Sequence, residues 1–150
     1  KDLTPLIRDH AAMCKVTAAL ALPFLNAGIT AVAGMEARGF IFGALVAREL
    51  EAGFIPLRKP GKLPAPAHSV SYNLEYGDAT LEMHTDAVSK NDRVLLVDDL
   101  MATGGTAAAS IELVRKASAE IVACAFVIEL DFLNGRQLLN DCRVHSLIHY

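Results

Sequence analysis

The segment VLLVDDLMATGGT, residues 94–106, carries the strongest structural signal in the chain. It begins with four apolar residues typical of a buried strand and continues with two carboxylates after Val97, Asp98 and Asp99. A turn with two adjacent glycines follows, and we expect a helix over 106–117. Such a turn presents backbone N–H groups at a helix N-terminus, which favours binding of an anion such as phosphate. Glycine has no Cβ, so the backbone can approach that phosphate closely.

Strand-like and helix-like segments alternate on both sides of this segment. The expected strands are 30–34, 54–57, 93–99, 120–130 and 144–150, and the expected helices are 11–25, 40–50, 106–117 and a short one at 136–140. Asp9 or His10 is expected to open the first helix. Apolar strands that alternate with helices indicate an α/β fold with an open, mostly parallel sheet and helices on both faces. Because such folds bind ligands at the carboxyl ends of the strands, the turns at 36–39, 58–66 and 98–106 are candidate site segments.

Residues 58–71 lack the pattern of a helix or a strand. The part from 58 to 66 holds three cations and three prolines, so we expect an extended or mobile loop over 58–71. Two short strands, 72–76 and 79–84, are expected to pair as an antiparallel hairpin through a turn at Gly77 and Asp78. The hairpin and the loop would form a hood over one end of the sheet.

The length of 150 residues is that of a single domain, 1–150, which is large enough to bury a full core. Apolar residues make up 53% and charged residues 21%, which excludes a disordered chain. The net charge of −3 argues against a protein that coats nucleic acid.

The uncharged stretch 16–35 has the length of a membrane span, but Pro23, Asn26 and Gly28 interrupt it. We therefore expect a helix, a turn and a buried strand there, and no membrane contact.

Three cysteines are scattered along the chain without CxxC spacing. Their odd number and their spacing support neither a disulfide framework nor a zinc site, so we expect a reducing compartment and a cytoplasmic protein. We expect Cys14 and Cys124 to be buried, and Cys142 to be more exposed with no neighbour that lowers its pKa. The five histidines show no ligand spacing, and we assign none of them to a metal or to catalysis.

The two carboxylates and the glycine turn suggest adjacent subsites for two parts of one ligand. The turn suits a phosphate, whereas the carboxylates suit sugar hydroxyls, and together they would form a cradle for ribose 5-phosphate. Taken separately, the turn could be only a connection, and the carboxylates only solvated groups at the end of a strand. Two other phosphate motifs, GxxxxGK[ST] and GxGxxG after a strand, are absent from the sequence.

Segment 94–106 resembles the phosphoribosyl diphosphate signature of the type I phosphoribosyltransferase family. Five further segments match motifs of that family in the same order: 2–6 (DLTPL), 36–43 (EARGFIFG), 58–64 (RKPGKLP), 71–77 (SYNLEYG) and 126–130 (FVIEL) before Gly135-Arg136. These motifs span nearly the whole chain, and within the family they are most similar to the members that use adenine. The family carries an N-terminal arm before the position of Lys1, so the resemblance implies that this arm is missing here.

The resemblance implies transfer of the 5-phosphoribosyl group from phosphoribosyl diphosphate to adenine, which gives AMP and pyrophosphate. It implies Mg²⁺ bound mainly through the pyrophosphate of the substrate, with no dedicated metal ligands from the protein. It also implies a homodimer. The transition state is expected to resemble an oxocarbenium ion with negative charge growing on pyrophosphate, so cations are needed near the leaving group.

The matching motifs assign residues to three subsites. Ribose 5-phosphate is expected at Asp98, Asp99, Ala102, Thr103, Gly104, Gly105 and Thr106. Pyrophosphate is expected at Arg38, Arg58, Lys59 and Lys62. The hairpin motif supplies Glu75, which is expected to hold the N7 and N9 side of adenine and to manage the proton lost from N9.

Two alternatives stay open on the sequence. Family members that use 6-oxopurines resemble Asp-Thr-Gly where this chain has Ala102-Thr103-Gly104, and alanine supplies no carboxylate, which favours adenine over another nucleobase. The second alternative is a binding module of the same fold that senses phosphoribosyl diphosphate and regulates transcription. The net charge of −3 and the lack of an additional helical segment argue against this regulatory role.

Overall fold

Five parallel strands form the central sheet, in the order β2-β1-β5-β6-β7. The computed structural model describes residues 2–74 and 77–150 of the chain. The strands of the sheet are β1 (Ala31–Met35), β2 (Gly53–Leu57), β5 (Arg93–Met101), β6 (Glu120–Glu129) and β7 (Val144–His149). All of β1, and β5 from Val94 to Val97, are buried, as continuous apolar strands covered on both faces must be.

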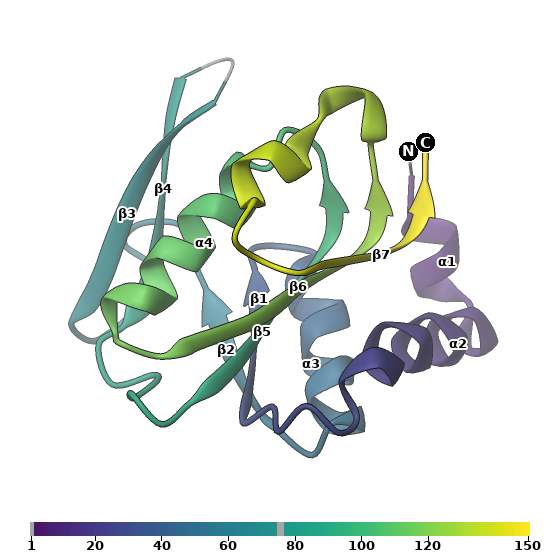
Figure 1. The fold of residues 1–150 in the computed structure, drawn as a ribbon, viewed down its shortest axis with the longest axis horizontal. Helices are drawn as coiled ribbons and strands as arrows, with labels where there is room; N and C mark the ends of the chain where they lie inside the picture. The colour runs from purple at the N-terminus through teal and green to yellow at the C-terminus, as the bar shows by residue number, and fades with distance from the viewer. Residues whose placement is uncertain (1, 75–76) are drawn as a thin grey trace.

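Helices cover both faces of this sheet (Figure 1). Helices α1 (Thr4–Arg8), α2 (His10–Ala21) and α3 (Gly39–Glu49) lie on one face, and α4 (Gly105–Lys116) lies on the other. Three short 3-10 helices are described as well: η1 (Leu22–Phe24), η2 (Asp131–Leu133) and η3 (Gly135–Leu139). The expected α/β fold, with an open, mostly parallel sheet between two helical layers, is confirmed.

An antiparallel hairpin, β3 (Ala67–Leu74) and β4 (Gly77–His84), lies beside α4 and is longer than predicted. The predicted loop extended to residue 71, but strand pairing begins directly after the last proline of the loop, Pro66. The predicted turn at Gly77 and Asp78 is wrong, because both residues belong to β4 and pair with residues of β3. The connection at 75–76 lies outside the described residues.

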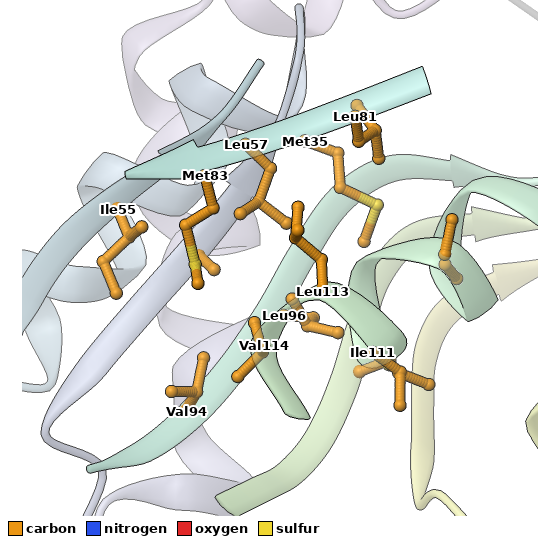
Figure 2. Close-up of a cluster of buried hydrophobic side chains, with 14 of the residues drawn as sticks. Met35, Ile55, Leu57, Leu81, Met83, Val94, Leu96, Ile111, Leu113 and Val114 are labelled. Carbon is orange, nitrogen blue, oxygen red and sulfur yellow. The ribbon is translucent and has the colours of Figure 1, made fainter. Parts of the chain in front are cut away.

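Two hydrophobic cores fill the space between the layers. One lies between the sheet and helices α2 and α3, and includes Phe24 and Phe42. The other lies between the sheet, α4 and the hairpin (Figure 2); it includes Met35, Ile55, Leu57, Leu81, Met83, Val94, Leu96, Ile111, Leu113 and Val114. Because hairpin side chains contribute to this second core, the hairpin is anchored to the body of the domain.

The helix boundaries follow local signals that the sequence carries. Asp9 caps α2, and its carboxylate accepts the backbone N–H of Ala12 at 2.8 Å. The predicted helix 11–25 ends earlier, at Ala21, where a 3-10 turn that contains Pro23 follows. The predicted helix at 136–140 is a 3-10 helix. Within residues 2–74 and 77–150, no helix has the length and apolar character to cross a membrane.

The three cysteines differ in their surroundings. Cys124 is buried in β6, as predicted. The prediction for Cys14 is wrong, because this side chain is exposed on α2, where its Sγ lies 3.7 Å from Nε2 of His10. Cys142 is half-buried, and the prediction that no neighbour lowers its pKa is also wrong. Hydrogen bonding with the thiol of Cys124 lowers the pKa of the Cys142 thiol.

Candidate active site

Two adjoining cavities lie at the carboxyl ends of the strands. The larger, of about 660 Å³, is lined by Glu36, Ala37, Arg38, Lys59, Pro60, Tyr72, Asp78, Ala79, Thr80, Leu81, Asp98, Asp99, Leu100 and Thr106. The smaller, of about 150 Å³, is lined by the turn 102–106 and its neighbours. Asp98, Leu100 and Thr106 line both cavities. The structure therefore brings together the three turns that the sequence marked as candidate site segments.

The turn that leads from β5 into α4 has the form of an anion site. Gly104 precedes the helix with φ +85°, a left-handed conformation that glycine adopts readily. The backbone N–H groups of Thr103, Gly104 and Gly105 donate to no acceptor in the described part of the chain. Because these groups lie at the N-terminus of α4 and line the smaller cavity, they are available to a phosphate.

A second glycine, Gly135 of η3, supports this turn by packing against its backbone. A Cβ built at Gly104 would clash with the backbone of Gly135, whose carbonyl carbon would lie 3.1 Å away. Conversely, a Cβ built at Gly135 would clash with the carbonyl oxygen of Ala102 and lie 3.0 Å from the backbone nitrogen of Gly104. Sequence reasoning assigned Gly135 no role, because no local pattern shows that two separate connections pack backbone to backbone.

The side chains of Asp98 and Asp99, near the end of β5, lie in different environments. Asp99 is buried, and its carboxylate accepts a hydrogen bond from Nε of Arg38, which raises the pKa of the guanidinium. The carboxylate of Asp98 accepts the backbone N–H of Asp99 at 2.8 Å. Burial, and then the neighbouring Asp99 carboxylate, raise the pKa of Asp98 well above its usual range. Arg38, predicted for pyrophosphate, thus directly contacts a residue predicted for ribose.

Glu36 holds residues 58–66, the cationic loop, against the turn after β1. Its side chain is only 8% exposed and lies 2.7 Å from Nζ of Lys62. The same carboxylate accepts the backbone N–H of Lys59 at 2.8 Å and lies 3.5 Å from Nε of Arg58. The hydrogen bond from Lys62 is the main cause that lowers the pKa of Glu36. The start of the predicted extended or mobile loop is therefore tied to the turn that carries Arg38. Sequence reasoning did not single out Glu36.

The hairpin forms one wall of the larger cavity. Tyr72 of β3 is half-buried, and its hydroxyl lies 3.2 Å from Oγ1 of Thr106 at the start of α4. Residues 78–81 of β4 continue this wall. Glu75, the predicted catalytic residue, lies outside the described residues, between the last residue of β3 and the first of β4.

An ion-pair network next to the turn holds the segment that contains Gly135. Glu129, at the end of β6, is buried and accepts two hydrogen bonds from Arg136, at 2.6 and 2.7 Å. Nδ1 of His149 lies 2.9 Å from Oδ1 of Asp131 and 3.8 Å from Glu129. No histidine had been assigned a partner from the sequence, because these residues come from three separate segments.

We expect the pKa of His149 to lie above that of an ordinary histidine. The hydrogen bond with Asp131 raises the pKa of His149, so this ion pair stabilises the fold below the unfolded pKa and is lost as pH rises through the folded pKa. An NMR titration of the ring protons should give a raised pKa that falls toward normal in Asp131→Asn. The control Asp86→Asn, in the turn after β4, should leave the midpoint unchanged. The same titration midpoint of His149 in the wild type, Asp131→Asn and Asp86→Asn would contradict the ion pair between His149 and Asp131.

Comparisons with known proteins agree with this geometry. The sequence model of the phosphoribosyl transferase domain matches residues 7–141. An adenine phosphoribosyltransferase from Nitrosococcus oceani is 63% identical over 150 residues, which cover 100% of this chain and 88% of that protein. A crystal structure of adenine phosphoribosyltransferase from Rhodothermus marinus is 48% identical with a TM-score of 0.96, and the match covers 100% of this chain and 86% of that one.

A third relative carries a ligand. The adenine phosphoribosyltransferase of Giardia lamblia, whose crystal structure is a complex with 9-deazaadenine, is 36% identical with a TM-score of 0.94. The match covers 99% of this chain and 85% of that one. Sequence and fold agree, and this chain belongs to the phosphoribosyltransferase family.

Proposed function

We propose that this chain transfers the 5-phosphoribosyl group from phosphoribosyl diphosphate to adenine, forming AMP and pyrophosphate. The observation that carries the proposal is the pair of adjoining cavities, one lined by the turn 102–106 and the other by paired carboxylates and cations. This pair matches a substrate with a phosphate at one end and a pyrophosphate at the other. The names of the relatives support adenine as the acceptor base.

In the proposed complex, the 5-phosphate accepts hydrogen bonds from the free N–H groups of residues 103–105, and Ala102 and Thr106 complete the wall of its cavity. Asp98 lines both cavities, so it is placed for the ribose that joins the two ends of the substrate. Asp99 lies next to it as the second partner for the hydroxyls. Its pairing with Arg38 couples the ribose subsite to the pyrophosphate subsite.

The proposed reaction breaks the bond between ribose C1 and the pyrophosphate oxygen, and the electron pair leaves with pyrophosphate. Arg38 and Lys59 line the larger cavity, and Arg58 and Lys62 are held beside it, so these cations stabilise the growing negative charge. N9 of adenine forms the new bond to C1. Glu75 accepts the proton that N9 loses, so no covalent intermediate with the protein is needed.

The residues present fit Mg²⁺ in the supporting role that the resemblance implied. Carboxylate oxygens such as those of Asp98 and Asp99 are hard ligands suited to this ion. Both carboxylates already accept protein hydrogen bonds, so they would hold the ion through its waters while the substrate provides direct ligands. When bound, Mg²⁺ neutralises charge on the pyrophosphate.

A panel of nucleobases tests the proposed function. Purified protein would be incubated with phosphoribosyl diphosphate, Mg²⁺ and, in separate reactions, adenine, hypoxanthine, guanine or uracil, and both nucleotide and pyrophosphate would be measured. We expect AMP and equimolar pyrophosphate with adenine, and far slower turnover with the other bases. Preferred turnover of another base would contradict the adenine assignment, and binding of phosphoribosyl diphosphate without turnover of any base would favour a regulatory module.

We expect Glu36→Gln to weaken binding of phosphoribosyl diphosphate. Glutamine removes the charge that holds Lys62 and Arg58, so the cations are less well placed; the KM for phosphoribosyl diphosphate should rise about tenfold, equivalent to about 1.4 kcal/mol. The KM for adenine should change little, which distinguishes loop positioning from general damage. Glu112→Gln, on the exposed side of α4, is the matched control. An unchanged or lower KM for phosphoribosyl diphosphate would contradict this role for Glu36.

We propose further that the protein is a homodimer and that it is cytoplasmic; both stay predictions. Support for an interface comes from large apolar side chains exposed on the described surface, among them Leu22 and Phe132, which are 67% and 69% exposed. Light scattering of the purified chain measures the oligomeric state.

A further inference from the structure

Two cysteines outside the active site lie in direct contact. Sγ of Cys124 on β6 and Sγ of Cys142, two residues before β7, are 3.6 Å apart. The backbone fixes this proximity, because the N–H of Cys124 donates to the carbonyl of Arg143 at 2.9 Å. A disulfide requires the sulfur atoms to approach to about 2.05 Å, so they must close by about 1.5 Å. Cys142 lies in the turn between η3 and β7.

The two thiols have complementary surroundings. Cys124 is fully buried, whereas Cys142 is half-buried and reachable from solvent. Hydrogen bonding between them raises the pKa of Cys124 and lowers that of Cys142. Arg115 adds positive charge near Cys142, although its guanidinium also pairs with Asp141 at 2.8 Å. An accessible thiol that ionises more easily, in contact with a buried thiol, is the arrangement of an attacking and a resolving cysteine.

We propose that Cys124 and Cys142 form a reversible disulfide by exchange with a low-molecular-weight disulfide. The thiolate of Cys142 attacks one sulfur of the small disulfide, forms a mixed disulfide and releases one small thiolate. Cys124 then loses its proton and attacks the sulfur of Cys142, which releases the second thiolate. Two protein thiols are oxidised and one small disulfide is reduced to two thiols, so atoms and electrons balance.

The position of this pair links it to the segment that supports the turn 102–106, named the phosphate turn after the 5-phosphate that we propose it binds. Residues 125–141, between the two cysteines, include η2, η3 and Gly135. The disulfide would close the ends of this segment into a covalent loop without using any residue placed in the active site. The proposal is therefore independent of the proposed function and holds or fails on the chemistry of the thiols.

The test uses glutathione disulfide with the folded wild-type chain under non-denaturing conditions, followed by intact mass and non-reducing peptide mapping. We expect a peptide pair that links residues 124 and 142. In Cys14→Ser, which lacks the exposed third thiol, we expect the same link, loss of two hydrogen atoms and a fall in free thiols from two to none. Dithiothreitol should restore both.

A trapping variant makes the order of attack measurable. Cys124→Ser should stop at a stable glutathione adduct on Cys142, whereas Cys142→Ser should leave Cys124 unmodified because it is buried. Stable glutathione adducts on wild-type Cys142 without the internal link would overturn the proposal. So would oxidation confined to disulfides between chains through Cys14. Because the wild type and Cys14→Ser alone decide the internal link, the proposal stays testable even if a core serine variant does not fold.

Discussion

A Gly104→Ala variant is expected to lose most of its affinity for phosphoribosyl diphosphate, with a KM raised about 100-fold or more. Alanine disfavours the φ of +85° by about 1–2 kcal/mol. Its Cβ would also collide with the backbone of Gly135, which no side-chain rotation can relieve. The turn must therefore move away from η3. Two misplaced N–H bonds to a charged phosphate, at about 1.5–3 kcal/mol each, account for this rise because every 1.4 kcal/mol is tenfold.

Gly28→Ala is the matched control for this variant. Gly28 also has a positive φ, +67°, but a Cβ there would make only ordinary contacts, the nearest at 3.5 Å to Nε of Arg93. It lies before β1, at the end of the sheet opposite the cavities. We expect this variant to be less stable by about 1–2 kcal/mol with an unchanged KM. A folded Gly104→Ala protein with wild-type KM would contradict the phosphate role of the turn.

The second large effect is expected for Glu75→Ala. Removing the group proposed to accept the N9 proton should lower kcat by a factor of about 100 to 10,000, the range of general-base contributions. The KM for phosphoribosyl diphosphate should stay within a few-fold of wild type, because residues 98–106 and the cationic loop are untouched. The position of Glu75 in the chain is consistent with this role: it connects β3 to β4, and both strands line the larger cavity.

Steady-state kinetics with both substrates varied would separate these effects. Glu75→Gln keeps the shape of the side chain and removes its basicity, so it should share most of the loss in kcat. Glu112→Ala, on the exposed side of α4, should behave as wild type. Full turnover by Glu75→Ala would refute the assignment and leave the proton to another group.

The central sheet and the phosphate turn could be predicted because their signals are local. Val94 to Val97 form an unbroken apolar run of the length typical of a strand buried on both faces, and β1 follows the same rule. The adjacent glycines at the start of α4 indicated a turn with special backbone geometry, and Gly104 has it. The extent of the hairpin was harder to predict, since among residues 67–73 of β3 only one side chain, Val70, is deeply buried.

Contacts between distant segments could not be predicted from one sequence. Glu36 meets Lys62, and Gly135 meets Gly104, only because parallel strands carry separate connections to the same edge of the sheet. Neither contact leaves a local pattern. The same holds for Cys124 and Cys142, whose pairing depends on the alignment of β6 with β7. Sequence reasoning thus identified groups that could bind a ligand, but not the residues that hold those groups in place.

The most direct test of the phosphate turn is an NMR titration of the ¹⁵N-labelled chain with ribose 5-phosphate. We predict that the backbone amide signals of residues 103–106 shift downfield most strongly, as expected for N–H groups that donate to a phosphate, and that Gly104→Ala abolishes these shifts. Binding that shifts other amides and leaves those four unchanged would contradict the account.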